Sequence, residues 1–418
     1  MLELFAVRGQ LAVSVLVHVT LAAAAWIATV LAAERTHTAQ GPASIRSQVM
    51  QDRWDRVRIL VPITAVSGFL IAAQICIFWQ SALSVAGATL IVPLVCAILA
   101  SIGRAVWVYR TPTPTMAATR GAALLGTLSG VASLTALAWL SHPAGAEIAH
   151  EGSLTASAFA AFTSPHGWMR VASTGLAATT LGATFFAAGA ARREHDFGLS
   201  TTVRTALLAL SLQAVVGLAT LRSIAQFEPV KLAAMAAQWD DRPNAPMQVG
   251  AWPYDFGEKT NPGKRLPVSL STLVHGDSSA VVQGLLATPM EDRPPVAALY
   301  ISIQVKVLTS LLAWLVLLGG TVQVARGKRP RRLLAWVATP LVLFNWTLGW
   351  LIAEVGRSPW TIRGALRVGQ ATWLPYGMTP TALLWCIAAV TLAVVAYRSC
   401  RRLDPEPDAP EPSSMATE

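Results

Sequence analysis

Charged residues are scarce in this chain, and long apolar stretches take their place. Only 13% of its 418 residues are charged, whereas 54% are hydrophobic. Apolar windows of about 20 residues, the length that crosses a bilayer, recur along the whole sequence. A soluble domain could bury a few such helices, but not so many in succession. The composition therefore excludes a soluble globular protein and predicts an all-α integral membrane protein.

The apolar windows predict a bundle of about nine transmembrane helices. The first window is too long for the core of a signal peptide, and no convincing small-residue cleavage pattern follows it. The predicted spans cover residues 10–32, 58–80, 83–108, 119–140, 168–191, 203–222, 297–321, 332–354 and 378–398.

Cysteine is sparse, and internal repeats are missing. The four cysteines (Cys76, Cys96, Cys386 and Cys400) include no CxxC pair, and three of them lie in or beside apolar spans. Thiols in such places are usually packed or idle, so they say nothing about a metal site. Transporters of this size usually show repeats or broken helices with paired charges near the midplane. An unrelated nine-span transporter is therefore the least favoured interpretation.

Basic residues are absent from residues 141–167, and the other alternate loops are poorer in them than the loops between. They concentrate instead after the odd-numbered spans and in the C-terminal tail, which is the positive-inside pattern. This pattern predicts an N-terminus outside and a C-terminus in the cytoplasm. The net charge of +10 is thus a topology signal, and we expect no nucleic-acid partner. The residues that carry the signal are Arg35, Arg46, Arg53, Arg56, Arg58, Arg110, Arg120, Arg192, Arg193, Arg326, Lys328, Arg329, Arg331, Arg332, Arg401 and Arg402.

One connection is far longer than the others and divides the chain. Residues 1–222 hold the first six predicted helices, residues 223–296 form an outer loop, and residues 297–402 hold the last three. Connections this long are usually functional or disordered. The segment 228–241 predicts a short amphipathic helix, with Leu232, Met235 and Trp239 on one face and Pro229 in its first turn. We expect the rest of the loop to be irregular and the acidic, Pro-rich tail 403–418 to be disordered.

Three ionisable residues inside spans are candidates for function, because burying such groups in a membrane is costly. His18 offers either a ligand for haem iron or a hydrogen bond between helices. Glu354 and Arg357 are three residues apart and so share one helix face, either as functional-site residues or as an interfacial ion pair. Lys306 is explained most simply as a lysine that extends to the surface or pairs within the bundle.

Three stretches carry a resemblance to a known family. They are GWLIAEVGRSPW at 349–360, RGQLAVSVLVHVT at 8–20 and KLAAMAAQW at 231–239. With nine spans and a long loop between spans 6 and 7, they resemble subunit I of the cytochrome bd quinol oxidases. The resemblance implies a multi-pass protein of the bacterial cytoplasmic membrane. It also implies a heterodimer with a subunit II-like membrane protein, in contact with membrane lipid.

The resemblance also implies a catalytic site. His18 and Glu354 would ligate the iron of the paired haems where oxygen is reduced to water, with haem b expected and haem d left open. Arg357 would neutralise a haem propionate or the liganding carboxylate, and Trp350 and Trp360 would pack against the porphyrin. Lys231 would belong to the quinol-binding loop, with quinol or another donor supplying the electrons.

The sequence departs from the family at the positions that hold the low-spin haem b. The family has a His in span 5 and a Met in span 7, where alignment places Ser173 and Lys306. The span 3 acids are missing from GATLIVPLVCAILAS (87–101), and Ala236 replaces the loop glutamate. We therefore expect the low-spin haem b site to be absent. The alternative interpretation is a bd-like membrane haem protein, or a degenerate paralogue, without quinol oxidase activity.

Overall fold

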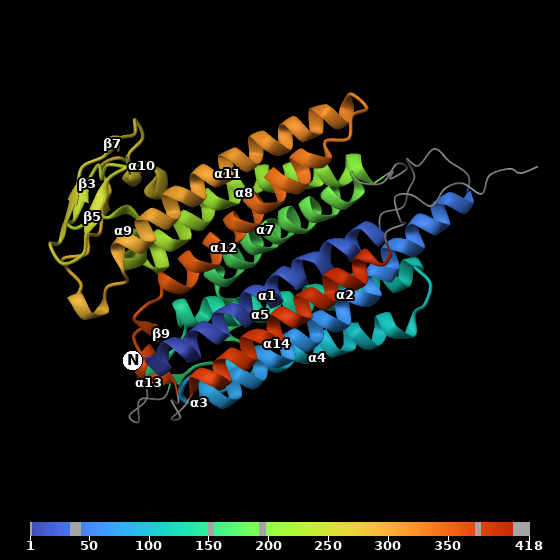
Figure 1. Cartoon of the computed structure of the whole chain (residues 1–418). Helices are drawn as coiled ribbons and strands as arrows, with labels where there is room; N and C mark the ends of the chain where they lie inside the picture. Colours follow the sequence, from blue (N-terminus) through green and yellow to red (C-terminus); the bar gives the residue numbers. More distant parts are fainter. Residues whose placement is uncertain (1, 34–42, 149–153, 192–197, 373–377, 404–418) are drawn as a thin grey trace, which may run out of the picture.

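A computed structural model describes residues 2–33, 43–148, 154–191, 198–372 and 378–403. Within these ranges, nine helices are long and apolar enough to cross a membrane, which confirms the predicted spans (Figure 1). They are carried by α1 (Leu2–Ala33), α2 (Ala43–Phe78), α4 (Ala88–Arg110), α5 (Met116–Ser141), α7 (Pro165–Ala190), α8 (Leu199–Phe227), α11 (Val296–Ala325), α12 (Thr339–Val355) and α14 (Met378–Arg401). The direction in which the chain crosses the membrane stays a prediction.

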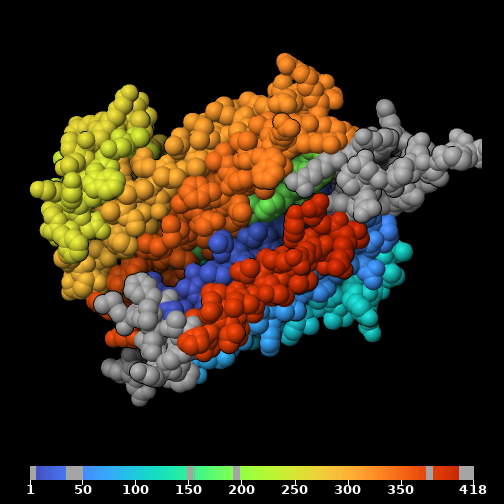
Figure 2. All heavy atoms as spheres, viewed as in Figure 1, coloured from blue at the N-terminus to red at the C-terminus, as the bar shows by residue number. Residues whose placement is uncertain are grey.

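The long helices form two groups that meet along α7. Helices α7, α8, α11 and α12 pack together, and α1, α2, α4, α5 and α14 form the second group. Helices α1 and α5 join the groups by packing on α7. Figure 2 shows α14 lying along α1 on one face of the molecule. Buried apolar side chains of α1, α7, α8, α11 and α12 make one continuous core cluster across this junction.

Two expected spans differ in detail from the observed helices. The span predicted at 83–108 is interrupted at Gly87, whose φ of 53° lies in a region that other residues rarely adopt. The chain therefore has a separate short helix α3 (Gln80–Ala86) before α4. Before α12, residues Leu333–Ala338 form a π-helical turn. Pro340 follows it and cannot donate the usual backbone hydrogen bond, which explains the wider turn.

The segment 223–296 between α8 and α11 is more ordered than we expected. The first helix, predicted at 228–241, is present but shorter, as α9 (Pro229–Ala236), so Trp239 lies beyond its end. Ala237 ends the helix in the left-handed region with a φ of 51°. The irregular structure expected after α9 is wrong, because the segment forms three antiparallel two-stranded ladders (Figure 1). They pair β3 (Arg242–Pro243) with β8 (Val281–Val282), β4 (Gln248–Val249) with β7 (Lys264–Arg265), and β5 (Trp252–Tyr254) with β6 (Lys259–Asn261). Strands of two or three residues are too short to show an alternating pattern in the sequence.

Short elements complete the described chain at the ends of the long helices. The predicted disordered tail lies outside the described residues beyond Leu403. The remaining elements are β1 (Glu147–Ile148), β2 (Leu154–Thr155), α6 (Ala160–Thr163), α10 (Leu270–His275), the 3-10 turn Met290–Asp292, β9 (Trp360–Ile362), β10 (Leu366–Arg367) and α13 (Val368–Ala371).

Candidate functional site

His18 lies on α1 against helix α2. Its Nδ1 is 2.9 Å from the hydroxyl oxygen of Ser67, and that hydroxyl donates to the carbonyl of Thr64 at 2.8 Å. Because the Ser67 proton is already used, the Ser67 oxygen accepts from Nδ1–H of a neutral His18. Nε2 then carries the free lone pair. A histidine whose second nitrogen is fixed by a hydrogen bond is oriented as a metal ligand requires.

Glu354 lies at the end of α12 between two arginines. Arg357 donates to Oε2 at 2.6 Å, which confirms the ion pair expected from their spacing. Arg170 of α7 donates to Oε1 at 3.4 Å. The Glu354 side chain is nevertheless 40% exposed, while those of Arg357 and Arg170 are 12% and 11% exposed. The carboxylate is therefore held by charge on two sides and remains open on another.

The two predicted tryptophans have different surroundings. Trp350 lies beside the Glu354 site, because the Arg170 guanidinium sits 5.9 Å from its ring centre. The ring of Trp346 is 5.9 Å away on the same helix. Trp360 instead stacks under Arg367, whose guanidinium is 5.0 Å from its ring centre. Only Trp350 is thus tied directly to a residue that holds Glu354.

The helices of His18 and Glu354 meet across α7. Leu16 and Val19, which flank His18, pack on the same core cluster as Trp346 and Trp350 of α12. Helix α1 contacts α7 through a hydrogen bond from Trp26 to Thr179 of 3.4 Å. The structure therefore places the two candidate ligands on helices that share one neighbour.

Lys306 is held inside the bundle by a neighbouring helix. Its ammonium donates to the side-chain oxygen of Asn345 at 2.9 Å and to the Asn345 carbonyl at 3.4 Å. The Asn345 amide donates in turn to Thr309, Ser310 and the Lys306 carbonyl at 2.7 to 3.0 Å. This network links α11 and α12, so Lys306 is paired within the bundle, as one of the two simple interpretations expected.

Lys231 belongs to a buried cluster where α9 meets the bundle. Its ammonium lies 3.1 Å from one oxygen of Glu228, and Nε2 of His166 lies 2.8 Å from the other. The three residues are 3%, 0% and 4% exposed. Burial alone opposes ionisation of Glu228, but Lys231, His166 and Arg363 hold its pKa well below the usual range. Burial lowers the pKa of Lys231 in spite of the neighbouring carboxylate.

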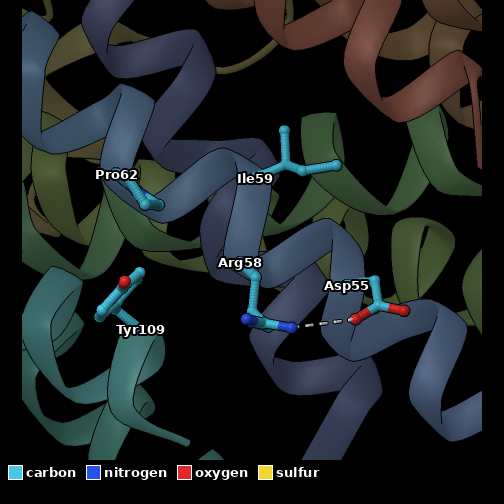
Figure 3. Close-up of a pocket in the computed structure, with 5 residues that line it drawn as sticks. All are labelled: Asp55, Arg58, Ile59, Pro62 and Tyr109. Atoms are coloured by element: carbon cyan, nitrogen blue, oxygen red, sulfur yellow. Dashed lines mark ion pairs between the residues drawn. The ribbon is translucent and has the colours of Figure 1, made fainter. Parts of the chain in front are cut away.

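A cavity at the end of the bundle away from α9 contains none of the candidate site residues described above. It has a volume of about 260 Å³ and is lined by Asp55, Arg58, Ile59, Pro62 and Tyr109 (Figure 3). Arg58 and Asp55 are a loose pair at 3.8 Å. The lining comes from the middle turns of α2 and the last turn of α4, far along the bundle from α9 (Figure 1).

Comparison with protein-family models decides the identity. The model for cytochrome bd terminal oxidase subunit I matches residues 7–403. The chain belongs to this family. The family comprises bd-type quinol oxidase subunits, which reduce oxygen with bound haem, use quinol and pair with a subunit II. The predicted family and the membrane-protein character are thereby confirmed.

Individual relatives are distant. A Bacillus subtilis (strain 168) protein assigned as a cytochrome bd menaquinol oxidase subunit I is 25% identical over 351 residues, covering 77% of this chain and 78% of the relative. A cytochrome bd ubiquinol oxidase subunit 1 of the same organism is 24% identical over 280 residues, covering 61% of this chain and 59% of the relative. The bd oxidase structure from Geobacillus thermodenitrificans has a TM-score of 0.84 at 20% identity, covering 96% of this chain and 98% of the other, which establishes the shared fold.

The residues around Glu354 fit a bd-type haem. Arg357 uses one nitrogen for Glu354, and its Nε and Nη1 are buried without a hydrogen-bond partner. A guanidinium with two buried, unpaired donor nitrogens suits an anion such as a haem propionate. The imidazole of His18 and the carboxylate of Glu354 are both established kinds of iron ligand.

The positions aligned with the low-spin haem b ligands do not fit that haem. Ser173 offers a hydroxyl, which is a poor iron ligand. The Lys306 amine is committed to Asn345, and its Nζ lies 3.5 Å from the place that a Cβ on Gly349 would take. A charged lysine fixed by hydrogen bonds has no free lone pair for iron.

Sequence reasoning missed several residues near the site. Arg170 is an ionisable residue inside a predicted span, the same signal that identified Lys306. Glu228 stands three residues before Lys231, a spacing that favours contact in a helix. Arg104, inside another predicted span, donates to Thr29 of α1 at 2.7 Å. Only His166 gave no signal, because its partner lies on a different segment.

Proposed function

We propose that this chain is the oxygen-reducing subunit of a bd-type oxidase, with His18 and Glu354 as the ligands of two haems. Glu354 and Arg357 would be the catalytic pair, Trp350 and Trp360 would line the porphyrin, and Lys231 would serve the donor loop. The observation that carries the proposal is the Glu354 carboxylate between two arginines, one of which keeps two unpaired donors.

The chain's own residues have clear tasks in such a site. Bound haem supplies oxygen binding and electron transfer. Ser67 fixes the His18 ring so that Nε2 can face the iron. Arg170 and Arg357 offset the charge of Glu354, which stabilises a partly exposed carboxylate at the end of a span. Of the two haem types, we assign haem b to this pair of sites, with haem d as the alternative for the haem at His18.

Electron entry would differ from that of typical bd oxidases. The Lys306–Asn345 network supports the absence of the low-spin haem b. Electrons from quinol or another donor would then enter at the outer face, where Glu354 and Arg357 would hold the haem that supplies electron transfer. The same network favours the second candidate, a bd-like haem protein without quinol oxidase activity.

The surroundings of the site complete the proposal. We assign the chain to the bacterial cytoplasmic membrane with its N-terminus outside, in a heterodimer with a subunit II-like protein. The transmembrane parts would be residues 1–222 and 297–402, separated by the donor loop 223–296. Fusions of a periplasmic reporter enzyme to residue 270 and to the C-terminus test this topology, because only the first should be active.

The decisive experiment is the dithionite-reduced minus air-oxidised spectrum of the purified complex, with a pyridine haemochrome count. We expect two haems per chain, a high-spin or chlorin-type band and no low-spin haem b band. The variants His18→Ala and Glu354→Gln should each lose haem, whereas His275→Gln, which changes an exposed residue of α10, should keep both haems. A folded complex without haem would overturn the proposal. Two haems without oxygen consumption by any quinol would favour the second candidate.

A further inference from the structure

The buried cluster under α9 contains a carboxylate–histidine pair with an unusual setting. In the described part of the chain, Glu228 is the only acidic residue among the buried ones. It stands at the junction of α8 and α9 and reaches His166 at the start of α7 (left end of Figure 1). A structural ion pair with Lys231 alone would explain a carboxylate here. It does not explain why the other oxygen of Glu228 lies against a histidine, His166.

The hydrogen bonds fix the state of that histidine. An ionised carboxylate only accepts, so His166 donates to Glu228 from Nε2–H at 2.8 Å. Nδ1 then accepts from the hydroxyl of Ser223, 2.9 Å away. If Nδ1 gains a proton, the Ser223 hydroxyl can rotate so that its oxygen accepts a hydrogen bond from the new N–H group. The imidazolium would still face the Glu228 carboxylate, which stabilises its charge. His166 is therefore built to take up one proton at Nδ1.

A second histidine leads from this pair toward the surface. His142, half-buried at the end of α5, has its ring centre 6.4 Å from that of His166. Phe227 lies against both rings, at 4.8 and 5.8 Å. Burial lowers the pKa of His142, and a proton on His166 would lower it further, so His142 releases a proton readily to water. The two rings thus form a short path from the buried pair to the outer face.

The same cluster touches the Glu354 site. A Cβ on Gly356, two residues after Glu354, would lie 2.6 Å from Cε of Lys231. The Lys231 side chain therefore lies directly against the end of α12. The charged groups that face His166 are Glu228 itself, Lys231 from α9 and Arg363 beyond β9, with His142 from α5. An electron donor bound at the α8–α9 corner, the junction of these two helices at Glu228, would lie next to the Glu354 site and next to His166 as proton acceptor.

We propose that His166, oriented by Glu228, accepts the protons of a quinol oxidised at the α8–α9 corner and passes them through His142 to the outer water. This rests on the proposed function with quinol as donor. Two quinols lose four electrons and four protons and become quinones, and one oxygen takes up four electrons and four protons to give two waters. Each quinol O–H bond that breaks sends its proton to Ser223, whose own proton moves to Nδ1 of His166. Proton uptake at oxygen is separate and involves none of these residues.

The test uses the purified heterodimer in liposomes with decylubiquinol and a short-chain menaquinol. Oxygen consumption is measured from pH 5.5 to 8.5 for the wild type, His166→Gln, Ser223→Ala, Glu228→Gln and Glu228→Asp. His275→Gln serves as the control for an exposed histidine in the same outer segment. Haem spectra and thermal unfolding establish which variants are folded.

We expect kcat to fall about a hundredfold in His166→Gln, the range for loss of a general base, with KM within about threefold. Because only neutral His166 can accept a proton, wild-type kcat should fall on the acid side. Glu228→Gln removes the charge that stabilises the imidazolium, so it should move this acid limb to lower pH and reduce kcat. Glu228→Asp keeps the charge at a shorter reach, so the acid limb of its kcat–pH profile should lie between those of Glu228→Gln and the wild type. Ser223→Ala, the mildest change, should slow turnover even if the His166 variant does not fold.

Three other results would overturn the inference. One is a folded Ser223→Ala or His166→Gln complex with wild-type kcat and an unchanged pH profile. Another is a change in KM alone, which would make the cluster a support for the loop. The third is a wild-type complex that carries haem but oxidises no quinol, which would remove the quinol donor from the proposed function as well. Wild-type activity therefore separates failure of the donor assignment from failure of the proton path.

Discussion

The contact between α1 and α7 allows one prediction to be worked out from the structure. A Cβ added at Gly182 of α7 would lie 2.6 Å from Cγ2 of Ile27, 2.8 Å from its Cβ and 2.7 Å from the carbonyl oxygen of Ala23. Ordinary contacts start near 3.4 Å, so the helices must separate by most of an ångström. Side-chain rotation can relieve the contact with Ile27 Cγ2, but not those with its Cβ or with the backbone of Ala23. Overpacking of this kind costs about 1–3 kcal/mol.

Gly175 on the same helix provides a matched control. A Cβ there would meet nothing within 4 Å. Replacing glycine by alanine inside a helix stabilises by about 0.5–1 kcal/mol, so Gly175→Ala should raise stability slightly. Gly182→Ala gains the same stabilisation from replacing glycine in a helix. The overpacking outweighs it, so the free energy of unfolding should still fall by about 1–2 kcal/mol. The assay is SDS-induced unfolding of the detergent-solubilised protein, followed by tryptophan fluorescence.

A truncated partner sharpens this comparison. Ile27→Ala removes Cγ2 but leaves the Ala23 carbonyl, so combining it with Gly182→Ala should recover about 1 kcal/mol relative to additivity. The reasoning is refuted if Gly182→Ala unfolds at the same SDS concentration as Gly175→Ala, or later.

Three further predictions concern the buried polar residues. Converting Ser173→His together with Lys306→Met should add a low-spin haem b band to the reduced spectrum, and an unchanged spectrum would show that more than the ligands has been lost. Glu228→Gln should cost about 3 kcal/mol at neutral pH, because it leaves a buried cation without its counter-charge, as thermal unfolding would show. The low pKa of Glu228 means that its contribution is complete above the unfolded value of about 4.3 and is lost on acidification, so wild type and variant should converge below that pH. Asn345→Leu should destabilise by about 2–4 kcal/mol, since it removes the side-chain acceptor of the Lys306 ammonium and leaves only the longer hydrogen bond to the backbone carbonyl of residue 345, and equal unfolding midpoints would contradict this.

The sequence predicts local features of this protein well. The nine spans follow from apolar length alone, and the Glu354–Arg357 pair follows from a spacing of three residues on a helix. The break at Gly87 was missed because the residues on both sides are equally apolar. The ladders after α9 were missed because their strands contain two or three residues.

The tertiary part of the site was harder to predict. Arg170 and Glu354 are 184 positions apart, and His166 and Ser223 are 57 apart. No periodic pattern links such positions, since they meet only when helices from different parts of the chain pack together. The family resemblance supplied the candidate ligands His18 and Glu354, but it pointed to Lys231 without its partner Glu228.

The position of α7 between the two helix groups has a consequence for how such proteins can diverge. The helices of His18 and Glu354 both pack against α7, so the spacing of the two candidate ligands depends on the thickness of one helix and its side chains. The connecting loops contribute nothing to that spacing. Insertions and deletions between the spans can therefore accumulate without changing it, whereas a single enlarged side chain on the inner faces of α7 can.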